Sequence, residues 1–131
     1  MGATSDSGQL AKGIAAYELF KQTYPREATP YVNLGVTYAQ LGEFEKSLDN
    51  AKEAMRVDPD EIRGYGQTAT DYMGLNRLDE AKAVAKAGLQ RNPGFTSLHE
   101  ALAIIALAQG DLATSEKEEA SFMHSQTSNL M

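Results

Sequence analysis

The chain has 131 residues, no cysteine and a formal net charge of −6 at pH 7. The lack of cysteine excludes disulfides and thiolate metal sites. The acidic balance and scattered Lys and Arg residues disfavour nucleic-acid binding, which needs a basic patch. No apolar stretch approaches the roughly 20 residues that span a bilayer, and no signal peptide is visible. We therefore expect no membrane insertion, and a soluble protein of the cytoplasm is favoured.

The N-terminal segment is predicted to divide into two parts. Residues 1–8 are small and polar, and we expect them to be disordered. Residues 9–27 form half of a repeated unit, in which Gln9 to Tyr24 is a second helix that lacks its first partner. This assignment comes from counting back from Pro25 by the repeat interval given below.

Residues 28–61 are predicted to form a helical hairpin. Thr29 is the expected N-cap of its first helix, and Pro30 then takes the first helical position, where a missing N–H does no harm. Gly42 is expected to end this helix, because glycine accepts the left-handed conformation of a C-terminal cap. The second helix, which Pro59 closes, carries these apolar residues: Phe44, Leu48, Ala51, Ala54 and Met55.

Residues 62–95 and 96–123 are predicted to repeat this plan. Asn76 takes the place of the turn glycine in the first of these units, and asparagine tolerates the left-handed conformation better than most residues. Gly110 has the same place in the last unit. The array is thus expected to extend over residues 9–124, followed by a tail of residues 125–131.

An interval of 34 residues relates the units. It recurs in three sets of positions: Pro25, Pro59 and Pro93; Tyr31, Tyr65 and His99; and Leu10, Phe44, Leu78 and Leu112. A period of this length predicts stacked helical hairpins, each too small to bury its own apolar face. The sequence therefore predicts an all-α stack of hairpins and favours a binding scaffold over an enzyme.

The order of these residues resembles the tetratricopeptide repeat (TPR). The unit of residues 28–61 fills every signature position: Tyr31, Leu34, Gly35, Tyr38, Gly42, Phe44, Ser47, Ala51, Ala54 and Pro59. The next two units depart from the signature, and the resemblance covers about residues 9–123. It implies a TPR-like α-solenoid, a right-handed superhelical stack of antiparallel hairpins. Residues 76–83 are also similar to repeat regions of larger bacterial proteins such as serine/threonine kinases and regulators.

The resemblance further implies that a partner protein binds on the concave wall of the superhelix. The positions that line this wall correspond to Thr29, Val32, Asn33, Val36, Ala39 and Gln40; Arg63, Gly66, Gln67, Thr70, Met73 and Gly74; and Ser97, Glu100, Ala101, Ile104, Leu107 and Ala108. Small and apolar residues with a stripe of amides suit an extended peptide or a partner helix. The alternative is that these residues are only the solvent side of amphipathic helices, but they would then form a large exposed apolar patch.

Some members of this family bind the C-terminal carboxylate of chaperones through a clamp of two lysines, two asparagines and an arginine. Asn33 and Arg63 fall near clamp positions, but Val32 and Val36 stand where the clamp has Lys and Asn. The sequence therefore argues against binding of a chaperone tail.

Glycines inside the predicted helix from residue 62 have two interpretations, since each costs up to about 1 kcal/mol relative to alanine. Gly66 and Gly74 could let a ligand approach the backbone, or the helix is simply weak there. We favour the weak helix, which predicts that alanine at both positions stabilises the fold.

The two ends of the array indicate a second hypothesis, self-association within a homodimer. Glu119 and Phe122 stand where earlier units have small residues, so no standard repeat is expected to follow, yet Phe122 favours an apolar contact. Tyr17 and Phe20 likewise replace alanine in the first half-unit, and Ile14 lacks a partner helix. Both ends are therefore predicted to be incompletely capped.

Motifs for catalysis, metals and cofactors are missing from the sequence. The two histidines, His99 and His124, have no cysteine partners and no zinc spacing. His99 occupies an aromatic position of its repeat and is expected to be a packed side chain. No phosphate loop, nucleophile elbow or EF-hand loop is present. We therefore expect a protein that is not an enzyme and has no cofactor.

Overall fold

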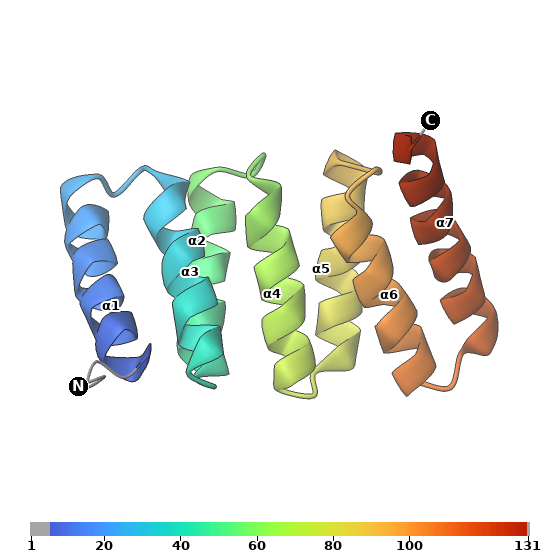
Figure 1. The fold of residues 1–131 in the computed structure, drawn as a ribbon, viewed down its shortest axis with the longest axis horizontal. Helices are drawn as coiled ribbons and strands as arrows, with labels where there is room; N and C mark the ends of the chain where they lie inside the picture. Colours follow the sequence, from blue (N-terminus) through green and yellow to red (C-terminus); the bar gives the residue numbers. More distant parts are fainter. Residues whose placement is uncertain (1–5, 131) are drawn as a thin grey trace.

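The computed structural model describes residues 6–130, which form a row of seven helices (Figure 1). The helices are α1 (Asp6–Thr23), α2 (Ala28–Gln40), α3 (Phe44–Val57), α4 (Ile62–Gly74), α5 (Leu78–Arg91), α6 (Thr96–Ala108) and α7 (Leu112–Leu130). Helix α1 lies at one end of the row and α7 at the other. The predicted fold class, an all-α stack of antiparallel helical hairpins, is confirmed.

The three hairpin turns have the same backbone geometry. Gly42, Asn76 and Gly110 have positive φ angles of 77°, 59° and 78°. In each turn the following N–H donates back to a carbonyl five residues earlier, as from Glu43 to Tyr38 at 2.9 Å. This pattern satisfies helix-end carbonyls and needs one left-handed residue. The predicted roles of the two glycines and of Asn76 are confirmed.

Helix bounds differ from the sequence expectations at three places. Helix α2 begins at Ala28 after Glu27, so the prediction of Thr29 as N-cap is wrong. Pro30 is the third helical residue, where its missing N–H still costs nothing because the first four N–H groups have no acceptor within a helix. Helix α1 begins at Asp6, inside the segment expected to be disordered, and α7 continues through most of the predicted tail. Once a helix is nucleated, each further residue adds a backbone hydrogen bond. Residues 1–5 and 131 lie outside the described residues.

Small residues allow successive hairpins to pack closely. Ala51, Ala54 and Ala85 are fully buried on the second helices of their hairpins. A methyl group on Gly88 would lie 2.5 Å from Leu98 Cδ1, so α5 and α6 pack closely there. Contacts between helices therefore run along the row and between the first helices of successive hairpins, α2 with α4 and α4 with α6.

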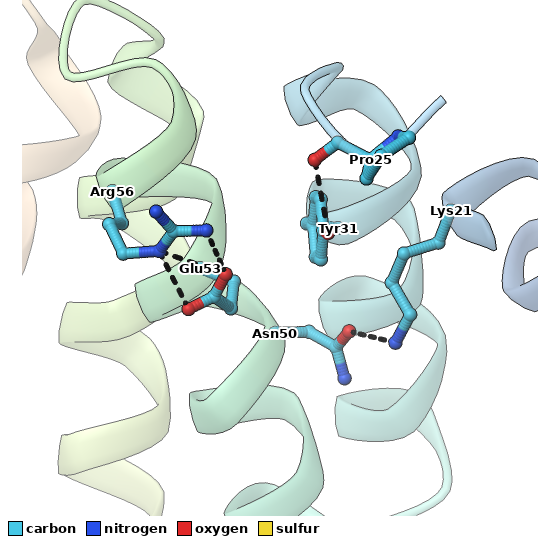
Figure 2. A network of polar contacts seen from close by, with 6 residues as sticks. All are labelled: Lys21, Pro25, Tyr31, Asn50, Glu53 and Arg56. Atoms are coloured by element: carbon cyan, nitrogen blue, oxygen red, sulfur yellow. Dashed lines mark hydrogen bonds and ion pairs between the residues drawn. The ribbon is translucent and has the colours of Figure 1, made fainter. Parts of the chain in front are cut away.

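Helix α1 is joined to the next hairpin by polar contacts (Figure 2). Lys21 Nζ donates to Asn50 Oδ1 at 3.3 Å, and the Tyr31 hydroxyl donates to the Pro25 carbonyl at 3.2 Å. Asn50 also donates to the Lys46 carbonyl at 2.9 Å, which fixes its side chain on α3. Helix α1 thus lies beside α2 and is linked to α3 by a side-chain bond, without a first helix of its own unit among the described residues.

The glycines of α4 do not share one explanation. A methyl group on Gly74 would lie 2.9 Å from the Phe44 ring, so the ring would have to move. On Gly66 it would lie 3.8 Å from Phe95 Cε1, an ordinary contact. Alanine at both positions is therefore no longer expected to stabilise the fold, because the gain at Gly66 is opposed by the clash at Gly74.

Candidate functional site

A hollow of about 310 Å³ lies over α4 and the helices on either side of it, α2 and α6. We call it the concave hollow, and its walls are Val32, Asn33, Val36, Arg63, Gly66, Gln67, Thr70, Phe95, Ser97 and Ala101. Each of the three hairpins thus contributes through its first helix or the residue before it. The hollow combines apolar side chains with two amides, two hydroxyls and one guanidinium.

The structure gathers only part of the predicted wall into this hollow. Thr29, Gln40 and Met73 do not line it. Met73 packs instead against the buried cluster that includes Leu48 and Ile105. Three further predicted residues line a second hollow of about 360 Å³, the terminal hollow, between α6 and α7: Glu100, Ile104 and Leu107, together with Ala103, Glu119 and Met123.

Val32 is buried, contrary to the expectation of an exposed apolar stripe. Its side chain is only 3% exposed and packs with Tyr31 and Ala54. Because α2 lies against both α3 and α4, a residue between these two contact faces is covered. Val36, one turn further along, remains 40% exposed and forms the apolar wall that a ligand could reach.

Phe95 is a wall residue that sequence reasoning missed. It precedes α6, and its ring lies beside Gly66 of α4. The signal is in the repeat interval, since the equivalent positions in the two earlier units are Glu27 and Glu61. An aromatic side chain in a place that is otherwise acidic adds apolar surface to this hollow.

Arg63 lies on the wall with its charge already paired. Arg63 Nε is 2.8 Å from Glu61 Oε1, and the same carboxylate accepts the Arg63 backbone N–H at 3.2 Å. The side-chain hydrogen bond from Arg63 holds the pKa of Glu61 below its ordinary value. The hollow therefore contains a guanidinium of fixed direction and little uncompensated positive charge.

Gln67 is held by groups beneath the wall. Its Nε2 donates to Asp71 Oδ1 at 2.8 Å and lies 3.4 Å from Ser47 Oγ, which donates to Asp71 Oδ2 at 2.6 Å. Asp71 is fully buried, and burial raises the pKa of its carboxyl to about 6 against the lowering effect of the hydrogen bonds from Ser47 and Gln67. Sequence reasoning missed Asp71, although an acidic residue on the buried face of a helix is a signal.

His99 is a partly buried residue that joins three segments. Its Nδ1 lies 2.7 Å from Glu118 Oε2 on α7, and its Nε2 lies 2.8 Å from the Pro93 carbonyl oxygen. The expectation of a packed histidine agrees with these contacts. Within the described residues, no group of three or more His, Cys, Asp or Glu could hold a metal ion, and no helix is long and apolar enough to cross a membrane.

The predicted self-association residues differ in exposure. Ile14 and Tyr17 are partly buried on α1, whereas Phe20 is 36% exposed. Phe122 belongs to α7, but its side chain lies outside the described part of the chain. Glu119 is exposed on the wall of the terminal hollow.

Comparison with family models gives two matches, both described as tetratricopeptide repeat. They cover residues 28–61 and residues 67–121. Together they include the hairpin with the complete signature and most of the two that follow it.

Curated relatives match over part of their length. The yeast heat shock protein STI1 is 30% identical over 91 residues, 66% of this chain and 15% of that protein. The Schizosaccharomyces pombe DnaJ homolog subfamily C member 7 homolog is 40% identical over 65 residues, which are 47% of this chain and 14% of that protein. The yeast Hsp70/Hsp90 co-chaperone CNS1 is 24% identical over 90 residues and is matched over 23% of its length. The chain thus spans less than a quarter of each of these three proteins.

Solved structures share the fold at low sequence identity. A crystal structure of MamA has a TM-score of 0.86 and 16% identity, over 97% of this chain and 74% of that one. The Arabidopsis OM64 TPR domain has a TM-score of 0.73 and 22% identity, over 81% of this chain and 88% of that one. At these identities the likeness concerns the fold alone, and the bacterial origin inferred from residues 76–83 stays a prediction.

Proposed function

The chain belongs to the tetratricopeptide repeat family, and we propose that it is a non-catalytic scaffold that binds a peptide or helix of a partner protein in the concave hollow. The observation that carries this proposal is the convergence of three hairpins on one surface that is both apolar and polar. Val36 and Phe95 offer apolar contact, while Asn33 and Gln67 offer amides that can hydrogen-bond a peptide.

Two relatives are named after the chaperones Hsp70 and Hsp90. They are the Hsp70/Hsp90 co-chaperone CNS1 and the Hsp70-Hsp90 organising protein of Plasmodium falciparum. The concave hollow lacks the residues that such partners would need. Val32 is buried and Val36 is apolar where a carboxylate clamp needs Lys and Asn, and the Arg63 guanidinium is already paired with Glu61. The concave hollow therefore favours an uncharged peptide segment over a terminal carboxylate.

Substitution of the polar wall tests the proposal. Asn33→Ala and Arg63→Ala should each lower the affinity for a bound peptide about three- to tenfold, because each removes one hydrogen-bonding group from the wall. The free energy of unfolding should change by less than about 1 kcal/mol, since the Asn33 side chain makes no hydrogen bond among the described residues and the Arg63 pair is exposed. Affinity is measured by calorimetry with a peptide selected from a random library displayed on phage.

Gln90→Ala provides a matched control, because Gln90 is an exposed amide on α5, away from the walls of the concave hollow. It should leave the affinity unchanged. Equal affinities for wild type, Asn33→Ala and Arg63→Ala would mean that the selected peptide binds elsewhere, and the concave hollow would lose its assigned role.

Self-association within a larger bacterial signalling protein is the second candidate function. It is favoured by exposed apolar side chains at both ends of the row. Leu19, Phe20 and Tyr24 are exposed on or next to α1, and Leu107 and Met123 are exposed beside the terminal hollow. These two groups lie at opposite ends of the molecule, so they would require contacts between copies.

A further inference from the structure

Asp71 is a buried carboxylate without a cation to pair with it. Its side chain is fully buried on α4, and its two oxygens accept hydrogen bonds from Ser47 and Gln67. The positions one repeat interval away on either side are Thr37 and Ile105, which carry no charge. The carboxylate is therefore a feature of the middle hairpin alone and is not required by the packing of the stack.

The carboxylate determines how the Gln67 amide is oriented. An ionised carboxylate can only accept hydrogen bonds, so Gln67 must direct its NH₂ group toward it. The Nε2 atom lies 2.8 Å from Asp71 Oδ1 and 3.4 Å from Ser47 Oγ, so both of its hydrogens face acceptors beneath the wall. A methyl group on Gly35 would lie 3.3 Å from Gln67 Cγ, so α2 also confines the Gln67 stem. The Oε1 atom is then the one polar atom of Gln67 left for a ligand.

We propose that Asp71 is a positioning residue that makes Gln67 present its carbonyl oxygen to the concave hollow, so that this hollow selects a peptide segment with a hydrogen-bond donor at that point. The backbone N–H of an extended peptide is the donor of matching chemistry. The inference rests on the proposed function of the same hollow and adds the polarity of one contact. It concerns specificity, because an acceptor facing a donor is favourable and an acceptor facing another acceptor is not.

Asn33 provides an internal comparison, because it is the equivalent wall residue one interval before Gln67. Thr37 takes the place of Asp71 there, and its hydroxyl donates to the backbone carbonyl of Asn33 at 2.8 Å, leaving the side-chain amide unheld. Asn33 can therefore present either end of its amide to a ligand. The two neighbouring amides on one wall differ in whether a carboxylate holds them.

Protonation of Asp71 would remove the constraint. Ser47 on α3 and Gln67 on its own helix donate hydrogen bonds to the carboxyl, and no charged side chain contributes to its pKa shift. Burial, opposed by the hydrogen bonds from Ser47 and Gln67, raises the pKa to about 6. Above that pH the carboxylate requires the NH₂ group, and below it the carboxyl can donate to Gln67 Oε1 and allow the amide to turn.

Nuclear magnetic resonance of the free protein tests the positioning step without a ligand. The side-chain amide signals of Gln67, assigned by their loss in Gln67→Ala, should move with pH around a midpoint near 6. The signals of Asn33 should show no such midpoint. Asp71→Asn should abolish the titration of Gln67 while leaving Asn33 unchanged. Gln67 signals that stay fixed across the range from about pH 4.5 to 8, a range that includes the raised carboxyl pKa, would overturn the inference, and the titration itself is followed on the wild-type protein.

N-methylation of a bound peptide tests the polarity of the contact. Each backbone N–H of the peptide selected from the phage library is replaced in turn by N–CH₃, and affinity is measured near pH 7.5. For wild type, methylation at one backbone nitrogen of the peptide should lower the affinity about three- to tenfold. Methylation at that nitrogen should not lower the affinity for Asp71→Asn or for Gln67→Ala. An identical N-methylation profile for wild type and both variants would contradict the inference.

The failures of the two proposals are distinguishable. A selected peptide that is insensitive to Asn33→Ala and Arg63→Ala contradicts the proposed function, whatever the Gln67 signals do. If the affinity for the peptide depends on Asn33 and Arg63, but not on Asp71 or on any single peptide N–H, the concave hollow remains the binding site. Asp71 then has no positioning role.

Discussion

At the scale of single residues, the stack depends on positions where a side chain has no room. A methyl group on Gly88 would lie 2.9 Å from Tyr65 Cβ as well as 2.5 Å from Leu98 Cδ1. Leu98 could rotate away, but Tyr65 Cβ is attached directly to the α4 backbone and cannot. Gly88 is therefore required by the fit of α5 against α4 and α6 and not by backbone conformation.

Gly88→Ala should destabilise the protein, because overpacking costs typically about 1–3 kcal/mol, and the gain in helix propensity is smaller, roughly 1 kcal/mol. Urea unfolding followed by circular dichroism measures the change. Gly66→Ala is the matched control, since its nearest contact would be at 3.8 Å, and it should stabilise by roughly 0.5–1 kcal/mol. A Gly88→Ala variant as stable as wild type would mean that α5 can move away from α4 and α6 at little cost.

At residue level, the TPR resemblance placed Asn33, Arg63 and Gln67 on one wall, and these residues line one hollow, while their role in binding stays a prediction. The burial of Val32 and Asp71 was not predicted, because it depends on how far α2 and α4 overlap with α3. The interval gives the face of a helix that a residue occupies, but the overlap of neighbouring hairpins decides whether that face is covered.

At the scale of helices, His99 on α6 forms a hydrogen bond with Glu118 on α7. Desolvation lowers the pKa of His99, but the hydrogen bonds to Glu118 and Pro93 and the charge of Glu118 together raise it above its ordinary value. A protonated imidazole donates from both nitrogens to both acceptors. A neutral imidazole has one N–H, so either the carboxylate or the carbonyl loses its donor.

Stability should therefore depend on the protonation of His99. Because its pKa is raised in the folded protein, the stabilisation is complete below the ordinary pKa and is lost as pH rises through the raised value. The loss should be at most about 1 kcal/mol, since the pair is partly solvated. Urea unfolding of wild type and His99→Gln, from below the ordinary histidine pKa to above the raised one, measures the loss. The difference in free energy of unfolding between the two proteins should shrink as pH rises. Asp71 titrates at lower pH and affects both proteins equally.

A difference between wild type and His99→Gln that stays constant with pH would show that His99 packs as a neutral side chain. Hydrogen exchange gives a local check. The amides of α7 should become less protected above the raised pKa, while those of α3, which does not contact α7, should not change.

Helix-level prediction was accurate for interior helices and less so at the ends. The turns at Gly42, Asn76 and Gly110 follow from one residue that must accept a left-handed conformation, so the sequence locates them closely. Gly8 stands one interval before Gly42, but it lies inside α1 and not in a turn, and the end of α7 has no such residue. Local composition therefore predicted a disordered segment and a tail where the helices continue to Asp6 and Leu130.

At the scale of the whole molecule, each hairpin contacts only its neighbours, so the two ends of the row decide whether copies associate. The α1 end is partly covered by its own side chains. The rings of Phe20 and Tyr24 pack edge to face at 5.6 Å between centroids, and Lys21 pairs with Glu18 at 3.1 Å on the same helix. Part of the aromatic surface at this end is thus already in contact within the chain.

We expect a monomer when absolute mass is measured by light scattering over a roughly hundredfold concentration range, because the Phe20 ring is packed against Tyr24 within the chain, whereas a stable interface between copies buries about 1,200 Å². A mass that doubles with concentration would instead favour self-association as the function. Phe20→Ser and Leu107→Ser would then separate two geometries. Contacts between two α1 ends would be lost only in Phe20→Ser, whereas head-to-tail contacts would be lost in both variants and would form open chains in wild type.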